Sequence, residues 1–165
     1  MDCEGSCSEA DAGEKDEFRM ESARIHEGEA MIGRPVRRGF HTVTPYLFVE
    51  HVDPVIDFMT AAFDARVTYR TTGSAGGRHV EVQIGDSKIM LGGDTPGGVE
   101  AESATFFLYV EDADAVYESA LEAGADSMMP PDRNFEEKRG AAVVDPFGNR
   151  WFIATHDPDD MDVDA

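Results

Sequence analysis

The sequence predicts an α+β domain made of two tandem βαβββ modules. The main observation is an internal repeat, in which residues 49–65 are echoed by residues 110–125. Both segments begin with Val-Glu, place Asp three residues after the Glu, and place Val two residues further on. In each case an alternating apolar run comes before the segment and a tight-turn hairpin follows it. These patterns indicate that one supersecondary unit is used twice.

The first module is expected to span residues 41–95 and to begin with a strand at Thr42–Val49. Asp53 is predicted to cap a helix that has Pro54 in its first turn. An apolar stripe supports the helix, and it consists of Val55, Ile56, Met59, Ala62 and Phe63. Strands are then predicted at Arg66–Thr72, Arg78–Ile84 and Lys88–Leu91.

The second module is expected to span residues 104–156 and to follow the same plan. Its helix is predicted at Asp112–Ala123, with Gly124 ending it in a left-handed conformation. Strands are predicted at Thr105–Val110, Ser127–Met129, Gly140–Val144 and Arg150–Thr155. The turn before the last strand is Asp-Pro-Phe-Gly-Asn, a combination typical of a tight connection.

Charge is the second strong feature, because the 165-residue chain carries a formal net charge of −20. Nucleic acids and anionic membranes attract basic clusters, so neither is expected as a partner. Much of the acid lies in residues 1–40 and 157–165, which are predicted to be solvated, disordered tails. Cys3 and Cys7 have no further ligands nearby and are interpreted as solvent thiols. The sequence has no apolar run typical of a membrane helix or signal, which predicts a cytoplasmic protein.

Several motifs resemble the vicinal oxygen chelate superfamily, which contains glyoxalases, bleomycin-resistance proteins and extradiol dioxygenases. The motifs are V-T-P-Y-L-F-V-E at 43–50, I-G-D-S-K-I-M-L at 84–91, L-Y-V-E-D-A-D-A-V at 108–116 and D-P-F-G-N-R-W at 145–151. The chain is most similar to the PhnB-like proteins of this group. The resemblance implies two curled mixed sheets around a cleft, helices on the outer faces, and a homodimer.

Side-chain alternation divides each predicted strand into two faces. The aliphatic sets, such as Leu47 with Val49 and Val80 with Val82, should pack on the helices. The aromatic and polar sets should line the cleft, and they comprise Thr44, Tyr46, Phe48, His79, Glu81, Gln83, Thr105, Phe107 and Tyr109. A shift of one residue in register would exchange the two sets.

Metal-using members of the superfamily place one His or Glu ligand on each of four strands. The corresponding positions of this chain are Thr44, Met90, Thr105 and Phe152. Zinc, nickel, manganese and iron prefer imidazole and carboxylate ligands in such sites, and none of the four residues provides one. We therefore expect no bound metal and no other cofactor. Glyoxalase and dioxygenase chemistry requires such a metal. A metal-dependent enzyme activity is therefore the alternative to a metal-free function.

His79 and Glu81 are the candidate catalytic residues, because they lie two positions apart on one strand and point the same way. They can be read as an acid–base pair, or as a hydrogen-bonded pair on the cleft wall. With His41, His51 or His156 they could also form the displaced metal site of a lyase or dioxygenase. Whether the protein is an enzyme stays open at this point.

The predicted function is that of a metal-free protein that binds a small molecule in the cleft between its modules. The predicted binding residues are Thr44, Tyr46, Phe48, His79, Glu81, Gln83, Met90, Thr105, Phe107, Tyr109 and Phe152. Apolar walls with a few polar groups are typical of small-molecule sites. Acidic groups and aromatic faces favour a ligand that is cationic or aromatic.

Overall fold

A computed structural model of the chain describes residues 36–133 and 139–156. The acidic tails predicted at 1–40 and 157–165 fall outside these ranges, apart from residues 36–40, and so do Cys3 and Cys7. Within the described part, no helix is long and apolar enough to cross a membrane.

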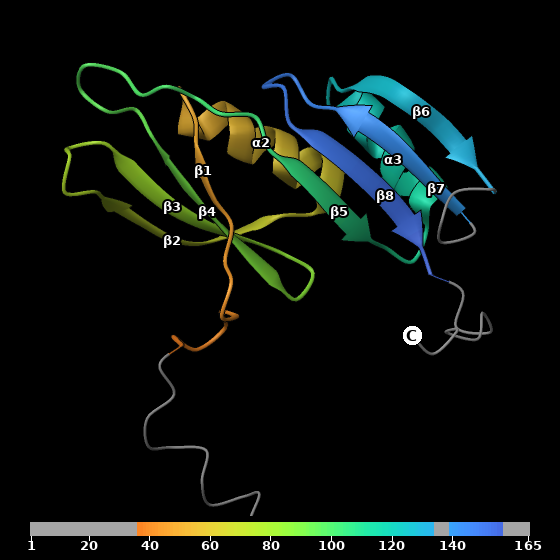
Figure 1. The fold of residues 1–165 in the computed structure, drawn as a ribbon, viewed down its shortest axis with the longest axis horizontal. Helices are drawn as coiled ribbons and strands as arrows, with labels where there is room; N and C mark the ends of the chain where they lie inside the picture. The colour runs from red at the N-terminus through yellow and green to blue at the C-terminus, as the bar shows by residue number, and fades with distance from the viewer. Residues whose placement is uncertain (1–35, 134–138, 157–165) are drawn as a thin grey trace, which may run out of the picture. The chain divides into compact units, whose positions relative to one another are not determined.

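The order of elements confirms the predicted α+β fold of two tandem βαβββ modules (Figure 1). The first module consists of β1 (Tyr46–Phe48), α2 (Val52–Phe63), β2 (Arg66–Thr72), β3 (Arg78–Ile84) and β4 (Ser87–Gly93). The second consists of β5 (Thr105–Tyr109), α3 (Ala113–Glu122), β6 (Asp126–Asp132), β7 (Arg139–Val144) and β8 (Arg150–Thr155).

β4, β5 and β7 differ from the predicted bounds by one or two residues at an end, and β1 and β6 differ by more, for reasons that involve proline. β1 is shorter than expected and begins directly after Pro45, whose carbonyl still accepts a bond from the Met90 amide. β6 is longer than expected and runs through Pro130 and Pro131. It lies at the edge of its sheet, where a residue without an amide hydrogen is tolerated.

Each module folds into one four-stranded mixed sheet with the same strand order. The first sheet has the order β1-β4-β3-β2 and the second has the order β5-β8-β7-β6. In each sheet the first strand runs parallel to its neighbour, and the other pairs are antiparallel. Tyr46 lies opposite Met90 in the first sheet, and Phe107 lies opposite Phe152 in the second. The two modules that repeat in sequence therefore also pair their strands at equivalent residues.

The start of α2 differs from the prediction, because Asp53 does not cap it. The N-cap residue is His51, which makes no capping bond with its side chain, while the Asp94 carboxylate accepts from the Val52 amide at 3.2 Å. Asp53 instead binds Arg78 and Arg70 on the neighbouring strands. These partners lie 25 and 17 residues along the chain, so local sequence rules could not reveal them.

α3 is capped as its sequence indicates. The Asp112 carboxylate accepts from the amides of Asp114 and Ala115. Gly124, directly after the C-cap residue Ala123, has a φ of 102°, a conformation that glycine adopts without strain.

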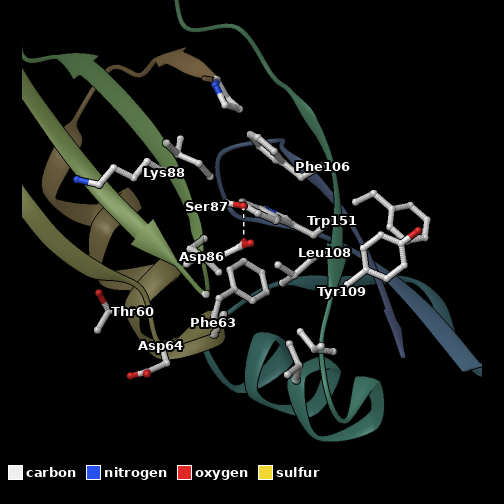
Figure 2. A pocket seen from close by; sticks show the side chains of 18 of the residues that line it. Thr60, Phe63, Asp64, Asp86, Ser87, Lys88, Phe106, Leu108, Tyr109 and Trp151 are labelled. Atoms are coloured by element: carbon white, nitrogen blue, oxygen red, sulfur yellow. Dashed lines mark hydrogen bonds between the residues drawn. The ribbon is translucent and has the colours of Figure 1, made fainter. Parts of the chain in front are cut away.

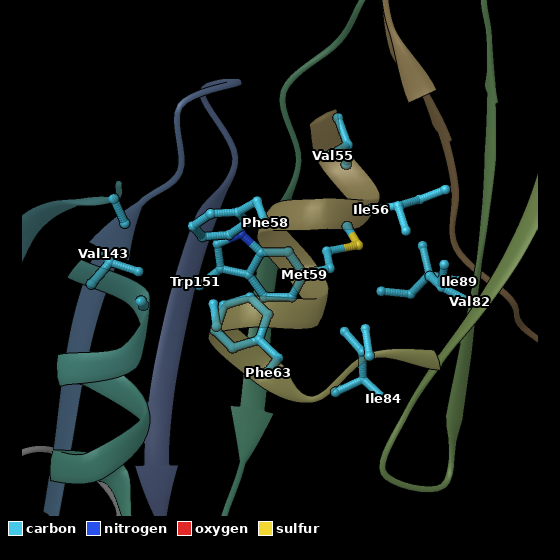
Figure 3. Close-up of a cluster of buried hydrophobic side chains, with 14 of the residues drawn as sticks. Val55, Ile56, Phe58, Met59, Phe63, Val82, Ile84, Ile89, Val143 and Trp151 are labelled. Atoms are coloured by element: carbon cyan, nitrogen blue, oxygen red, sulfur yellow. The ribbon is translucent and has the colours of Figure 1, made fainter. Parts of the chain in front are cut away.

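The helix-facing sides of both sheets contribute to a single hydrophobic core. In Figure 3, α2 lies between strands of the two sheets, and its apolar side chains point to both sides. Phe63 of α2 contacts Trp151 of β8 with ring centroids 4.5 Å apart, and Phe106 stacks on the same indole at 4.3 Å. Both sides of α2 are therefore covered, and the modules are held together by packing rather than by the linker alone.

The turn between β7 and β8 is built on a buried carboxylate. Asp145, which is 2% exposed, accepts bonds from the amides of Phe147 and Asn149, from the Asn149 side chain and from the Trp151 indole. The side-chain oxygen of Asn149 in turn accepts from the Ala104 amide. The D-P-F-G-N-R-W motif thus fixes β5, β8 and Trp151 and has a structural role here.

Candidate functional site

Face A is the side of the first sheet that lies opposite α2. It carries six of the predicted binding residues, namely Tyr46, Phe48, His79, Glu81, Gln83 and Met90. The pairing of Glu81 with Met90, and of Met90 with Tyr46, places them in adjacent strands on one side. Leu47, Val80 and Val82 point the other way, into the core. The observed register of the strands therefore places these side chains on the predicted faces of the sheet.

A row of polar contacts crosses face A. The Tyr46 hydroxyl lies 3.2 Å from Nδ1 of His79, and Nε2 of the same ring lies 3.7 Å from Oε1 of Glu81. Oε2 of Glu81 lies 3.6 Å from the Lys88 ammonium, which donates to the Thr68 hydroxyl at 3.0 Å. Glu81 is only 2% exposed, so its charge is balanced by groups of the protein itself.

Tyr46 is held in place by a glycine beneath it. A Cβ atom at Gly92 of β4 would lie 2.6 Å from the Tyr46 hydroxyl oxygen, closer than atoms can approach. The ring also contacts Phe48 at 5.0 Å and stacks on His79 at 5.6 Å between centroids. Tyr46 nevertheless remains 44% exposed, so one side of its ring is open to a ligand.

Face B is the corresponding side of the second sheet. It carries Thr105, Phe107 and Tyr109 of β5 and Phe152 of β8. Phe107 lies nearly parallel to Phe152, with ring centroids 6.3 Å apart, and is 5.0 Å from Tyr109. Phe107 and Tyr109 are 44% and 59% exposed, although both are large and apolar.

Within one chain, the predicted binding residues do not come together in one cavity. Because the helix-facing sides of both sheets belong to one core, face A and face B both lie outside it. A groove of about 850 Å³ between the modules includes only Phe107 and Tyr109 of the set (Figure 2). Phe63, Phe106, Leu108 and Trp151 line it from the core side. A smaller hollow of about 310 Å³ includes only Phe48.

The four positions that carry metal ligands in the superfamily do not fit a metal. Thr44 lies before β1, and its hydroxyl donates to the His41 carbonyl. Met90, Thr105 and Phe152 supply a thioether, a hydroxyl and a hydrocarbon ring, which are poor donors for zinc, nickel, manganese or iron. Across residues 36–133 and 139–156, no group of three or more His, Cys, Asp or Glu side chains is arranged to hold a metal ion.

The residues proposed as a displaced metal site are also dispersed. His79 and Glu81 contact Tyr46 and Lys88, as described above, whereas His51 binds Asp94 at the start of α2. His41 lines the groove between the modules instead of face A.

Three residues of face A were not singled out from the sequence. Alternation could have placed Lys88 on face A, because it lies two residues before Met90 on β4. Its long side chain extends to Glu81. Alternation could not identify Tyr69 and Thr68, because a bulge in β2 shifts the register between Val67 and Tyr69. Tyr69 is 48% exposed and contacts the His79 ring at 6.4 Å.

Each module also contains one ion pair between its helix and the third strand of its sheet. In the first module, Arg78 donates to both oxygens of Asp53 at 2.6 Å, and these bonds help to lower the pKa of Asp53 to about 2. In the second, Arg139 binds Asp114, which raises the pKa of the guanidinium. Both pairs lie away from faces A and B and serve to attach the helices.

Comparison with known proteins agrees with this architecture. The model of a family described as the Glyoxalase/Bleomycin resistance protein/Dioxygenase superfamily matches residues 39–153. An uncharacterized protein of Mycobacterium bovis is 32% identical over 122 residues, covering 67% of this chain and 80% of that protein.

Two solved structures illustrate the range of similar folds. A PhnB protein from Bacillus cereus has a TM-score of 0.55 at 13% identity, covering 70% of this chain and 99% of the other. The fosfomycin resistance protein FosX from Mesorhizobium loti has a TM-score of 0.52 at 19% identity, covering 72% of this chain and 93% of the other. At these identities the likeness concerns the fold alone.

Proposed function

We propose that this protein, which belongs to the glyoxalase/bleomycin resistance protein/dioxygenase superfamily, binds an uncharged aromatic small molecule without a metal, in a homodimer. The observation that carries the proposal is the exposure of aromatic side chains on both faces. Tyr46, Phe48 and Tyr69 on face A, and Phe107 and Tyr109 on face B, are each between 44% and 59% exposed. Exposed apolar patches of this kind mark binding surfaces.

A second copy of the chain is the partner that best accounts for two such faces. If face A of one copy covers face B of another, two-fold symmetry places the remaining two faces together as well. The dimer is then closed and contains two equivalent cavities. Each cavity is lined by the predicted binding residues of two copies, which a single chain keeps apart.

The ligand is proposed to be uncharged because face A has little charge to offer. Glu81 is buried, and Lys88 and His79 lie 3.6 and 3.7 Å from its two oxygens. A cationic ligand would gain little from a carboxylate that is already balanced, and it would lose its hydration on entering. The rings provide stacking for an aromatic ligand, and a neutral ring gains it without the loss of hydration that a cation would suffer.

Titration with three ligands that share one ring system tests this proposal. Indole is neutral, tryptamine is cationic, and indole-3-acetate is anionic at neutral pH. Calorimetry should give the highest affinity for indole and a stoichiometry of one ligand per chain. A preference for tryptamine would contradict the charge argument, and an absence of binding by all three would contradict the proposed function.

The metal-dependent alternative is tested by elemental analysis of untagged protein, before and after incubation with nickel, manganese, iron and zinc salts. The proposal predicts that no metal binds stoichiometrically under any of these conditions. Stoichiometric metal that disappears in a His79→Ala variant would instead support a lyase or dioxygenase with a displaced site.

A further inference from the structure

We propose that the Tyr46 oxygen acts as a hydrogen-bond acceptor inside the cavity, so that the protein selects aromatic ligands that carry an N–H or O–H group. This inference rests on the proposed function, because it concerns what the same cavity recognises. It follows from the direction of the hydrogen bonds in the row formed by Tyr46, His79, Glu81 and Lys88.

The buried carboxylate determines which nitrogen of His79 carries the proton. Oε1 of Glu81 lies 3.7 Å from Nε2, and the Lys88 ammonium is 3.6 Å from Oε2. An imidazole N–H directed at a carboxylate oxygen is favourable, whereas a nitrogen lone pair in the same place is repelled. Neutral His79 is therefore protonated on Nε2.

The tautomer of His79 then determines the direction of the next bond. With the proton on Nε2, Nδ1 carries a lone pair and can only accept. The Tyr46 hydroxyl, 3.2 Å away, must be the donor. A phenol has one hydrogen, so its oxygen keeps only lone pairs for a further partner. Glu81 thus fixes the tautomer of His79, and this tautomer leaves the Tyr46 oxygen as an acceptor at the surface of the cavity.

The geometry keeps this acceptor where a ligand can reach it. Gly92 leaves room for the Tyr46 ring on the sheet, and the stack on His79 holds its hydroxyl beside Nδ1. A ring that packs on the exposed side of Tyr46, beside Phe48, places its polar edge near the phenol oxygen. An N–H or O–H there gains a bond, while a methylated nitrogen gains none and obstructs the acceptor.

Indole and 1-methylindole form a suitable pair of probes, because they differ only in the N–H group. At pH 8 the wild-type dimer should bind indole about tenfold more tightly, the value of one net hydrogen bond. Tyr46→Phe should bind both probes with equal affinity and should bind 1-methylindole at least as well as wild type. Tyr117→Phe is the matched control, since it removes a phenol of α3 that lies away from both faces and donates to the Ser127 hydroxyl, and it should keep the tenfold preference.

The tautomer provides an independent readout. Nitrogen chemical shifts of His79 in labelled protein should identify the Nε2–H form, and Glu81→Gln should reduce both this bias and the preference for indole. An Nδ1–H tautomer in wild type, or a preference that survives in Tyr46→Phe, would overturn the inference. Equal binding of both probes would overturn it while leaving the proposed function intact. Binding of neither probe would overturn both.

Discussion

Phe63 of α2 and Trp151 of β8 lie with their ring centroids 4.5 Å apart, although they belong to different modules. Trp151 is 1% exposed and Phe63 is 8% exposed, so the contact is part of the core. It joins the helix of the first module to the sheet of the second. The two modules should therefore unfold as one cooperative unit, with the single tryptophan of the chain as a reporter of their junction.

Truncation at this junction gives the first prediction. Phe63→Ala should lower the free energy of unfolding by about 3–4 kcal/mol, because it removes a buried ring and leaves a cavity beside Trp151. Urea titrations followed by tryptophan fluorescence and by circular dichroism measure this loss. In wild type the two signals should change at the same urea concentration. Separate transitions in wild type would contradict the single core.

The buried turn carboxylate gives the second prediction. Asp145→Ala should lower the free energy of unfolding by about 3 kcal/mol, because it leaves buried donors of Asn149 and Trp151 without an acceptor. Asp86→Ala is the matched control in the equivalent turn of the first module, where the carboxylate is exposed and accepts from Ser87. The control should stay within about 0.5 kcal/mol of wild type. Equal effects of the two changes would contradict the structural role of the motif.

The glycine under Tyr46 gives the third prediction. Gly92→Ala should weaken indole binding by about tenfold, because the new Cβ displaces the Tyr46 hydroxyl from His79. Gly73→Ala serves as the control, since a Cβ there would make only an ordinary 3.6 Å contact with the Gly77 carbonyl oxygen. Calorimetric titration of both variants with indole checks this. Unchanged affinity in Gly92→Ala would show that Tyr46 does not contribute to the site.

The lowered pKa of Asp53 gives the fourth prediction. A carboxylate whose pKa falls from 3.8 to about 2 on folding stabilises the fold above pH 4 and loses this contribution as pH falls toward 2. The stability difference between wild type and Asp53→Asn should therefore be constant above about pH 5 and shrink toward zero near pH 2. Denaturant titrations between pH 2 and pH 7 measure it. In an Arg78→Gln background the same substitution should have a smaller, flatter effect, and an unchanged profile there would exclude Arg78 as the cause.

Much of the fold could be predicted from local patterns, because the two modules repeat both alternation and turns. β2, β3 and β8 begin and end at the expected residues. The same alternation placed Tyr46 and Glu81 on one face of the first sheet and Leu47 and Val80 on the other, as the observed strand pairing does. The motifs also identified the superfamily to which the chain belongs.

The candidate site was less accessible from sequence, because its contacts depend on long-range geometry. Asp53 was assigned to a helix cap, but two arginines from neighbouring strands bind it. Alternation indicated that Glu81 shares a face with His79, but not that it is buried beside Lys88. A repeat also cannot tell whether two modules face one another within a chain or between chains, since both arrangements use the same residues.

Mixing two binding-deficient variants tests the shared cavity most directly. One variant, Tyr46→Ala with His79→Ala, alters face A, and the other, Phe107→Ala with Phe152→Ala, alters face B. Neither should bind indole alone. After the two are mixed, unfolded and refolded together, each heterodimer should contain one cavity with both wild-type faces and should bind one indole. If the cavity lay within a single chain, no mixed dimer would contain an intact site, and the absence of restored binding would contradict the account.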